Sequence, residues 1–371
     1  MKRKLAFFMV VSFLLCTIFS VSGCAGKKES EAMLFVRKMG MGINMGNSLD
    51  STGLLEYNPL ADDLDFETFW GNPPLTREQF HEVKLAGFGT VRIPVTWQDH
   101  MDEEGKVSPV WMGRVDEVVR MALGEDLYVI LDTHHEDWLD LDGASQKITE
   151  EKFAFLWEQI ALQFKDCGEK LLFEGLNEPR KRDSEGEWQK GTKESREMLN
   201  ALNKIFVDTV RHSGESNESR YLLLAPYASN PISGGFEDFA LPQDSRLIVS
   251  IHAYYPYDFC QNMEDGASVS WDRGSQGNTK EMKKSFVNAK RKFVDKGIPV
   301  IMTEFGCVDK SNEAARQEWT KYVMELSEKY EIPCIWWDEG KNYKILDRTL
   351  LTWEEDILKI LTGKNSFERK K

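Results

Sequence analysis

The chain has 371 residues, of which 41% are hydrophobic, 29% are charged and 11% are aromatic. This composition provides enough apolar surface to bury a core, and it excludes a disordered or collagen-like chain. The formal net charge of −14 argues against nucleic acid as a partner, because phosphate binding requires clustered lysine and arginine. For the same reason we do not expect a substrate dense in negative charge.

The first residues have the layout of an export signal. Positive charges at positions 2–4 precede an uncharged apolar run over 5–21, which is typical of a secretory signal peptide. The run is too short for a comfortable membrane span, which needs about 20 apolar residues. Small residues just before Cys24 are similar to a bacterial lipoprotein signal. We therefore predict a signal peptide over 1–23, a lipid anchor at Cys24 that holds the exported protein at the cell surface or periplasmic membrane, and a flexible tether over 24–33. The alternative is ordinary secretion.

Four further cysteines follow the predicted leader and tether: Cys167, Cys260, Cys307 and Cys334. Their spacing contains no CxxC pair and no zinc pattern. A chain with a large core does not need disulfides for stability. We interpret these residues as buried free thiols.

Beyond residue 33, short apolar runs alternate with longer amphipathic stretches. Strands are expected at 42–45, 90–94, 128–131, 171–174, 221–225, 247–251, 300–303 and 335–337. Helices are expected at 77–86, 111–123, 151–165, 194–212, 280–296, 312–329 and 353–361. The alternation predicts an α/β protein with parallel strands and helical crossovers. Eight such units favour a (β/α)8 TIM barrel as a single catalytic domain over 34–365. A doubly wound sheet is the rival, but no GxGxxG follows the first strand.

Polar and aromatic side chains follow almost every predicted strand. The active site of a barrel lies at the C-terminal ends of its strands, so these residues should meet on one rim. They include Asn44, Asn47, Asp50, Arg92, Asp132, His134, His135, Glu136, Asn177, Glu178, His252, Tyr254, Glu304 and Trp337. So many carboxylates, imidazoles and aromatic rings at strand ends are hard to explain as packing alone.

Two carboxylates, Glu178 and Glu304, each follow an apolar strand and should face a crowded cleft. Glycoside cleavage needs such a pair, because one acid protonates the leaving oxygen while the other carboxylate attacks the anomeric carbon or activates water. The acid needs a pKa raised by burial or by nearby negative charge. The nucleophile must stay ionised, and we expect Arg92 to favour its charged form.

The histidines and tryptophans of the rim suggest sugar contacts. His134 and His135 are adjacent, so a strand would aim them to different sides. A metal site is an alternative for this pair, but there is no HExxH pattern, and hydrogen bonds to sugar hydroxyls and to the nucleophile are the preferred interpretation. Trp337 and Trp97 fit flat platforms on which a glucose ring stacks. Trp336 cannot face the cleft together with Trp337, so one of the two is structural.

Seven segments together resemble glycoside hydrolase family 5, the cellulase family, and most of all its subfamily 4 of endoglucanases and xyloglucanases. They are GINMGNSLD at 42–50, TVRIPVTW at 90–97, HHE at 134–136, FEGLNEPR at 173–180, HAYYP at 252–256, TEFG at 303–306 and WWDEG at 336–340. The resemblance runs from about residue 40 to 355. It departs at Glu339, where Asn is frequent, which adds a negative charge near the cleft. It departs also at Met45, where Leu is usual and where we expect a neutral packing change.

The resemblance implies a retaining mechanism, with Glu178 as proton donor and Glu304 as nucleophile. It implies that Asn177 bonds the sugar 2-hydroxyl, that Trp337 is a stacking platform, and that the remaining matched residues orient the nucleophile or contact the sugar. Those residues are Arg92, His134 and His252 with Tyr254 near the scissile bond, and Asn47, Asp50 and His135 farther away. We therefore predict a monomeric endo-β-1,4-glucanase that acts on cellulose-like, mixed-linkage or xyloglucan chains without a metal or organic cofactor. The alternatives are a mannanase or xylanase on the same scaffold, or a non-catalytic glycan-binding protein.

Overall fold

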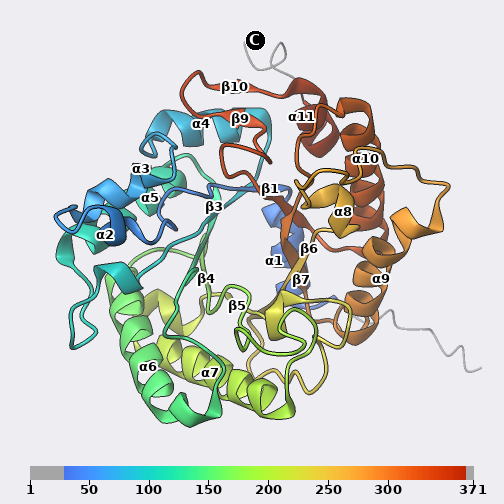
Figure 1. Ribbon diagram of the computed structural model, residues 1–371. Helices are drawn as coiled ribbons and strands as arrows, with labels where there is room; N and C mark the ends of the chain where they lie inside the picture. The colour runs from blue at the N-terminus through green and yellow to red at the C-terminus, as the bar shows by residue number, and fades with distance from the viewer. Residues whose placement is uncertain (1–28, 365–371) are drawn as a thin grey trace, which may run out of the picture.

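Eight parallel strands close into a barrel in chain order (Figure 1). The ring is completed where β1 pairs with β8. The strands are β1 (Gly42–Asn44), β2 (Thr90–Ile93), β3 (Tyr128–Asp132), β4 (Leu171–Glu174), β5 (Leu222–Leu224), β6 (Leu247–Ala253), β7 (Val300–Phe305) and β8 (Cys334–Trp336). The structure is a computed structural model that describes residues 29–364. The predicted (β/α)8 TIM barrel is confirmed, because short apolar runs joined by helical crossovers pair only in parallel.

Long helices surround the barrel (Figure 1). They are α4 (Arg77–Ala86), α5 (Pro109–Gly124), α6 (Gln146–Gln163), α7 (Lys193–His212), α9 (Gln276–Lys292), α10 (Glu313–Tyr330) and α11 (Glu355–Thr362). Local sequence explains their ends. For example, Thr76 and Gln79 form a reciprocal capping box before α4, and Gly87 ends this helix at φ 100°. No helix within residues 29–364 is both long and apolar enough to cross a membrane.

Shorter elements lie in the connections. They are α2 (Leu54–Tyr57), α3 (Phe66–Phe69), α8 (Tyr257–Cys260) and the antiparallel pair β9 (Leu346–Asp347) and β10 (Thr352–Trp353). The helix expected at 280–296 instead begins at Gln276 and ends at Lys292, where a 3-10 turn takes over. Cys167, Cys260, Cys307 and Cys334 are buried and free, as predicted.

The predicted tether over 24–33 is wrong in its last part, because helix α1 (Glu31–Met39) already begins there. Ser30 caps this helix by accepting a hydrogen bond from the backbone N–H of Met33. Its apolar face packs on inward-pointing strand residues, so that α1 closes the floor of the barrel (Figure 1). The buried side chains of α1 are Ala32, Met33, Phe35, Val36 and Met39. The predicted signal peptide and Cys24 lie outside the described residues.

Candidate active site

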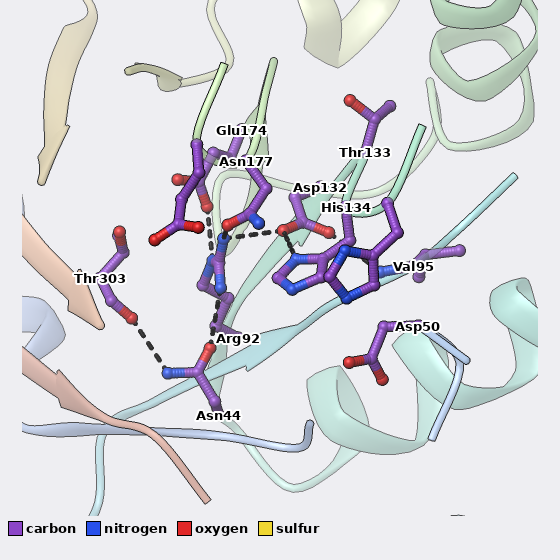
Figure 2. A network of polar contacts seen from close by, with 12 residues as sticks. Asn44, Asp50, Arg92, Val95, Asp132, Thr133, His134, Glu174, Asn177 and Thr303 are labelled. Carbon is purple, nitrogen blue, oxygen red and sulfur yellow. Dashed lines mark hydrogen bonds and ion pairs between the residues drawn. The ribbon is translucent and has the colours of Figure 1, made fainter. Parts of the chain in front are cut away.

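Arg92, on β2, is the centre of the polar network at the C-terminal rim of the barrel (Figure 2). Its guanidinium forms ion pairs with the carboxylates of Glu174, Asp132 and Glu304, and it is fully buried. Burial acts to lower the pKa of Arg92, but these three carboxylates outweigh it and raise the pKa. A fixed positive charge therefore lies beneath the cleft, and the planar fork of arginine suits several simultaneous contacts.

Glu304, on β7, is held by two donors. Arg92 Nη1 lies 2.7 Å from its Oε1, and the Tyr254 hydroxyl lies 2.8 Å from its Oε2. A register shift between β6 and β7 after Ile251 sets His252 directly opposite Glu304. Bulges of this kind re-aim side chains near active sites. Glu304 is thus a buried carboxylate with both oxygens occupied as acceptors, as a positioned nucleophile requires.

Glu178 follows β4 and shares with Glu304 a contact to His252. Its backbone adopts φ 45°, a conformation that non-glycine residues rarely take and that often marks functional positions. His252 Nδ1 lies 2.9 Å from Glu178 Oε1 and 3.4 Å from Glu304 Oε2. Oxygen atoms of the two carboxylates come within 4.8 Å of one another. The pair therefore faces a gap of the size of a single reacting centre.

The proton distribution differs from the expectation for Glu178. Burial acts to raise the pKa of Glu178, but the hydrogen bond and positive charge of His252 outweigh it and lower this pKa to about 2. Burial acts to lower the pKa of His252, but the charges of Glu304 and Glu178 raise it. Burial raises the pKa of Glu304, against the charges of His252 and Arg92. The opposite directions of these two pKa shifts favour a proton on His252 over one on Glu178 in the free enzyme.

Asn177 and Trp337, which the resemblance assigns to substrate contacts, follow β4 and β8. The side-chain oxygen of Asn177 accepts a hydrogen bond of 2.9 Å from Arg92, so its amide nitrogen remains available as a donor. Trp337 is half-buried and its ring is parallel to that of His134 at a centroid distance of 5.8 Å. Trp336 is fully buried, which confirms that only one ring of this dipeptide can face the cleft.

Trp97 is not a platform, contrary to the prediction from sequence. Its ring is fully buried, and its Nε1 donates to the backbone oxygen of Asp132 at 3.1 Å. A side chain without exposed area cannot stack on a polysaccharide. The spacing of Trp97 after β2 resembles that of a rim residue, but the chain turns inward there, and the large ring fills the core instead.

The two adjacent histidines do not diverge as expected. β3 ends at Asp132, so neither residue is in a strand, and the rings of His134 and His135 lie 4.5 Å apart. His134 Nδ1 lies 2.8 Å from Asp132, so this nitrogen does not orient Glu304. Burial lowers the pKa of both imidazoles, that of His135 to about 3.

Asn47 and Asp50 come from the loop after β1. Asn47 is half-buried with φ 53°. Asp50 has no exposed area, which makes it a structural anchor and not a direct sugar contact in this conformation. Its carboxylate accepts backbone N–H bonds from Asn47 and Ser48 at 3.0 and 2.7 Å. Burial raises the pKa of Asp50 to about 7.

The departure at Glu339 does not place a free charge in the cleft. This carboxylate is buried and accepts hydrogen bonds from the backbone N–H groups of Lys341, Asn342 and Tyr343. It therefore closes the turn after β8, and burial raises its pKa.

A cavity of about 570 Å³ is lined by Glu178, His252 and Tyr254. Its wall includes the aromatic side chains of Trp188, Tyr255 and Tyr257. The Arg180 guanidinium covers one face of Trp188 at 3.9 Å from the ring centroid. The sequence did not lead us to assign the rings of Trp188, Tyr255 and Tyr257 to the site.

The sequence predicted only some of the polar residues that lie beneath the cleft. Ser250 and Thr303 hydroxyls lie against each other, and Ser250 donates to Glu174, which in turn accepts from Arg92. Asn44 donates to the backbone oxygen of Thr303 at 2.9 Å and accepts from Arg92 (Figure 2). The available signal was the presence of polar residues inside otherwise apolar strands, since buried polar groups must be paired.

Comparisons with known proteins agree with this geometry. Residues 61–343 match the profile described as cellulase (glycosyl hydrolase family 5). Endoglucanase A of Ruminococcus albus is 41% identical over 343 residues, which cover 89% of this chain and 92% of that protein. Two solved structures are also similar. A broad specificity endoglucanase of subfamily 4 from Clostridium longisporum has a TM-score of 0.83 and 37% identity, with coverage of 89% of this chain and 97% of that chain.

The second structure is a xyloglucan-specific endo-β-1,4-glucanase from a metagenomic library, in complex with cellotriose. It has a TM-score of 0.84 and 35% identity, and the match covers 90% of this chain and 98% of that chain. The resemblance noted in the sequence is thereby confirmed. The closed barrel, the two facing carboxylates and these matches lead to one conclusion: the chain is a glycoside hydrolase and belongs to family 5, the cellulase family.

Proposed function

We propose that the protein is a retaining endo-β-1,4-glucanase in which Glu304 is the nucleophile and Glu178 the acid and base. The separation of the two carboxylates carries this proposal. Their oxygens come within 4.8 Å. Retaining glycosidases place the carboxyl groups about 5–5.5 Å apart, whereas inverting enzymes need about 6.5–9.5 Å to admit a water molecule.

In the first step, Glu304 attacks the anomeric carbon while the glycosidic oxygen takes a proton from Glu178. That proton comes from His252, whose Nδ1 is joined to Glu178 by a hydrogen bond of 2.9 Å. Its transfer to Glu178 produces the protonated acid that the step needs and leaves the total charge of the site unchanged. Glu304 remains ionised, with Arg92 and Tyr254 as donors to its two oxygens. The products of this step are a glycosyl ester on Glu304 and a released sugar hydroxyl.

In the second step, ionised Glu178 takes a proton from a water molecule that attacks the same anomeric carbon. The ester bond to Glu304 breaks, and the sugar leaves with its original anomeric configuration. Positive charge that develops on the sugar ring is stabilised by the Glu304 carboxylate and by the face of an aromatic ring such as Trp337. Asn177 contributes through its free amide nitrogen, which we assign to the sugar 2-hydroxyl.

The substrate proposal rests on the relatives and on the shape of the rim. Relatives at 30% identity or more include proteins named endoglucanase, lichenase or xyloglucan-specific endo-β-1,4-glucanase. We assign the side of Trp337 and Asn47 to the sugars before the scissile bond. The cavity beside Glu178 has the volume and aromatic wall to take the leaving chain, with Trp188 as a platform.

Sugar release tests the proposal. Reducing ends should appear from carboxymethylcellulose, mixed-linkage β-glucan and xyloglucan, with a rapid loss of viscosity, and NMR should show the β-anomer first. The α-anomer would refute the retaining mechanism, and faster action on mannan or xylan would refute the glucan assignment. Binding without release would identify a glycan-binding protein. Glu304→Ala should abolish turnover, and Glu178→Gln should slow polymers more than substrates with good leaving groups.

We further propose that Cys24 carries a lipid anchor. The small residues that precede it and the apolar run before them support this assignment. Cys24→Ser should release the protein from the membrane fraction of the producing cells. An unchanged membrane fraction would contradict the anchor without affecting the hydrolase assignment.

A further inference from the structure

Asp50, His134 and His135 form a second cluster of potential ligands, separate from the carboxylate pair. One carboxylate oxygen and one nitrogen from each imidazole lie within 4.8 Å of one another. The residues come from two loops, one after β1 and one after β3. Figure 2 shows Asp50 beside His134, with Asp132 next to the same ring.

The orientation of His134 suits metal binding. Its Nδ1 is held by Asp132 at 2.8 Å, which leaves Nε2 as the atom free to bind a ligand. Histidines that bind metals usually contact a carboxylate through the other ring nitrogen, because this contact fixes the tautomer and the ring plane. Asp132 thus has the position of a supporting residue for a metal ligand.

Asp50 is a buried carboxylate without a cationic partner. It accepts two backbone N–H bonds, but no lysine or arginine within residues 29–364 forms an ion pair with it. A carboxylate has about four lone-pair sites, so these two bonds leave others free. A bound cation would compensate the charge that the fold leaves unpaired at this position.

His135 can complete the cluster by a small movement. It is half-buried, and its ring nitrogens make no hydrogen bond with the described residues. Ligands about 2.0–2.2 Å from one tetrahedral ion lie about 3.3–3.6 Å apart. The three ligand atoms lie within 4.8 Å of one another, so small side-chain movements bring them to this separation. Two imidazoles and a carboxylate suit zinc, copper, nickel and cobalt ions better than magnesium or calcium, which prefer oxygen ligands.

We propose that Asp50, His134 and His135 bind one divalent transition metal ion, which inhibits the enzyme. The inhibitory part rests on the proposed function, because it assumes that sugar occupies the rim next to Trp337. The ring of Trp337 is parallel to that of His134, so an ion on His134 Nε2 lies beside this platform and competes with the sugar. Binding of the ion itself does not depend on that assumption.

Metal binding can be measured without turnover. Titration of the full-length protein with cobalt(II) should give one equivalent of bound metal with visible absorption bands, and zinc should displace it. Cellotriose in excess should weaken the binding. Absence of binding by the wild-type protein would overturn the proposed metal site. Tight binding that cellotriose does not affect would overturn the proposed competition with sugar.

A second group of residues, Glu178, His252 and Glu304, also has ligand atoms within 4.8 Å of one another. Variants can show which of the two groups binds the ion. His135→Ala and Asp50→Asn should each weaken cobalt binding at least 10-fold, whereas Glu178→Gln should leave it unchanged. Binding that survives His135→Ala but is lost in Glu178→Gln would place the ion between the catalytic carboxylates and refute the proposal. If Asp50→Asn fails to fold, His135→Ala alone decides, because His135 is in a loop and only half-buried.

Discussion

Replacement of Tyr254 by phenylalanine removes one of the two donors that hold Glu304. The hydroxyl donates to Glu304 Oε2 at 2.8 Å and thereby acts to lower the pKa of this carboxyl. Hydrogen bonds to charged groups contribute about 1.5–3 kcal/mol. Because one pKa unit corresponds to about 1.36 kcal/mol, the variant should raise the pKa of Glu304 by about 1–2 units. The nucleophile must be ionised, so activity should be lost at a higher pH during acidification.

The assay is the pH dependence of kcat/KM, which reports groups of the free enzyme. The acid limb of Tyr254→Phe should move upward by about 1–2 pH units. Tyr255→Phe is the matched control. Among the described residues, the Tyr255 hydroxyl is hydrogen-bonded only to Asn230, at 3.4 Å, so this variant should leave the acid limb in place. An acid limb of Tyr254→Phe at or below that of the wild type, or an equal movement in the control, would refute the reasoning.

Three further predictions concern other parts of the molecule. His252 has a raised pKa and is the proposed source of the proton for the leaving group. Wild-type kcat/KM should therefore decline as the pH rises through a value above 6.5, the ordinary pKa of histidine. A decline that starts below pH 6.5 would contradict this role. Arg220 is buried and donates to four backbone carbonyl groups, three of them in buried hydrogen bonds. Arg220→Leu should therefore cost about 3–5 kcal/mol in denaturant unfolding, against about 0.5 kcal/mol or less for Arg291→Leu at an exposed position. A Cβ atom at Gly46 would lie 2.8 Å from Trp337, so Gly46→Ala should weaken cellotriose binding in calorimetry, and unchanged affinity would count against Trp337 as the platform.

Much of the barrel could be predicted because its strands are short apolar runs with helical patterns between them. Such units pair in chain order, and their C-terminal ends must form one rim. Glu178, Glu304 and Arg92 were therefore identifiable as neighbours from their positions directly after or within strands. Helix α1 was not predicted, since its nine residues follow the leader region, and its apolar face becomes evident only against the barrel floor.

The sequence by itself determined the order of the strands, the polar rim and the residue types that glycoside cleavage needs, because these follow from local periodicity and from the connection rules of parallel sheets. Only the tertiary structure decided which side chains contact one another. The register shift after Ile251 sets His252 opposite Glu304, where it also contacts Glu178, and this contact lowers the pKa of Glu178 instead of raising it. Burial of Trp97 and exposure of Trp337 were decided in the same way, because solvent access and electrostatic fields depend on the packing of segments far apart in the chain.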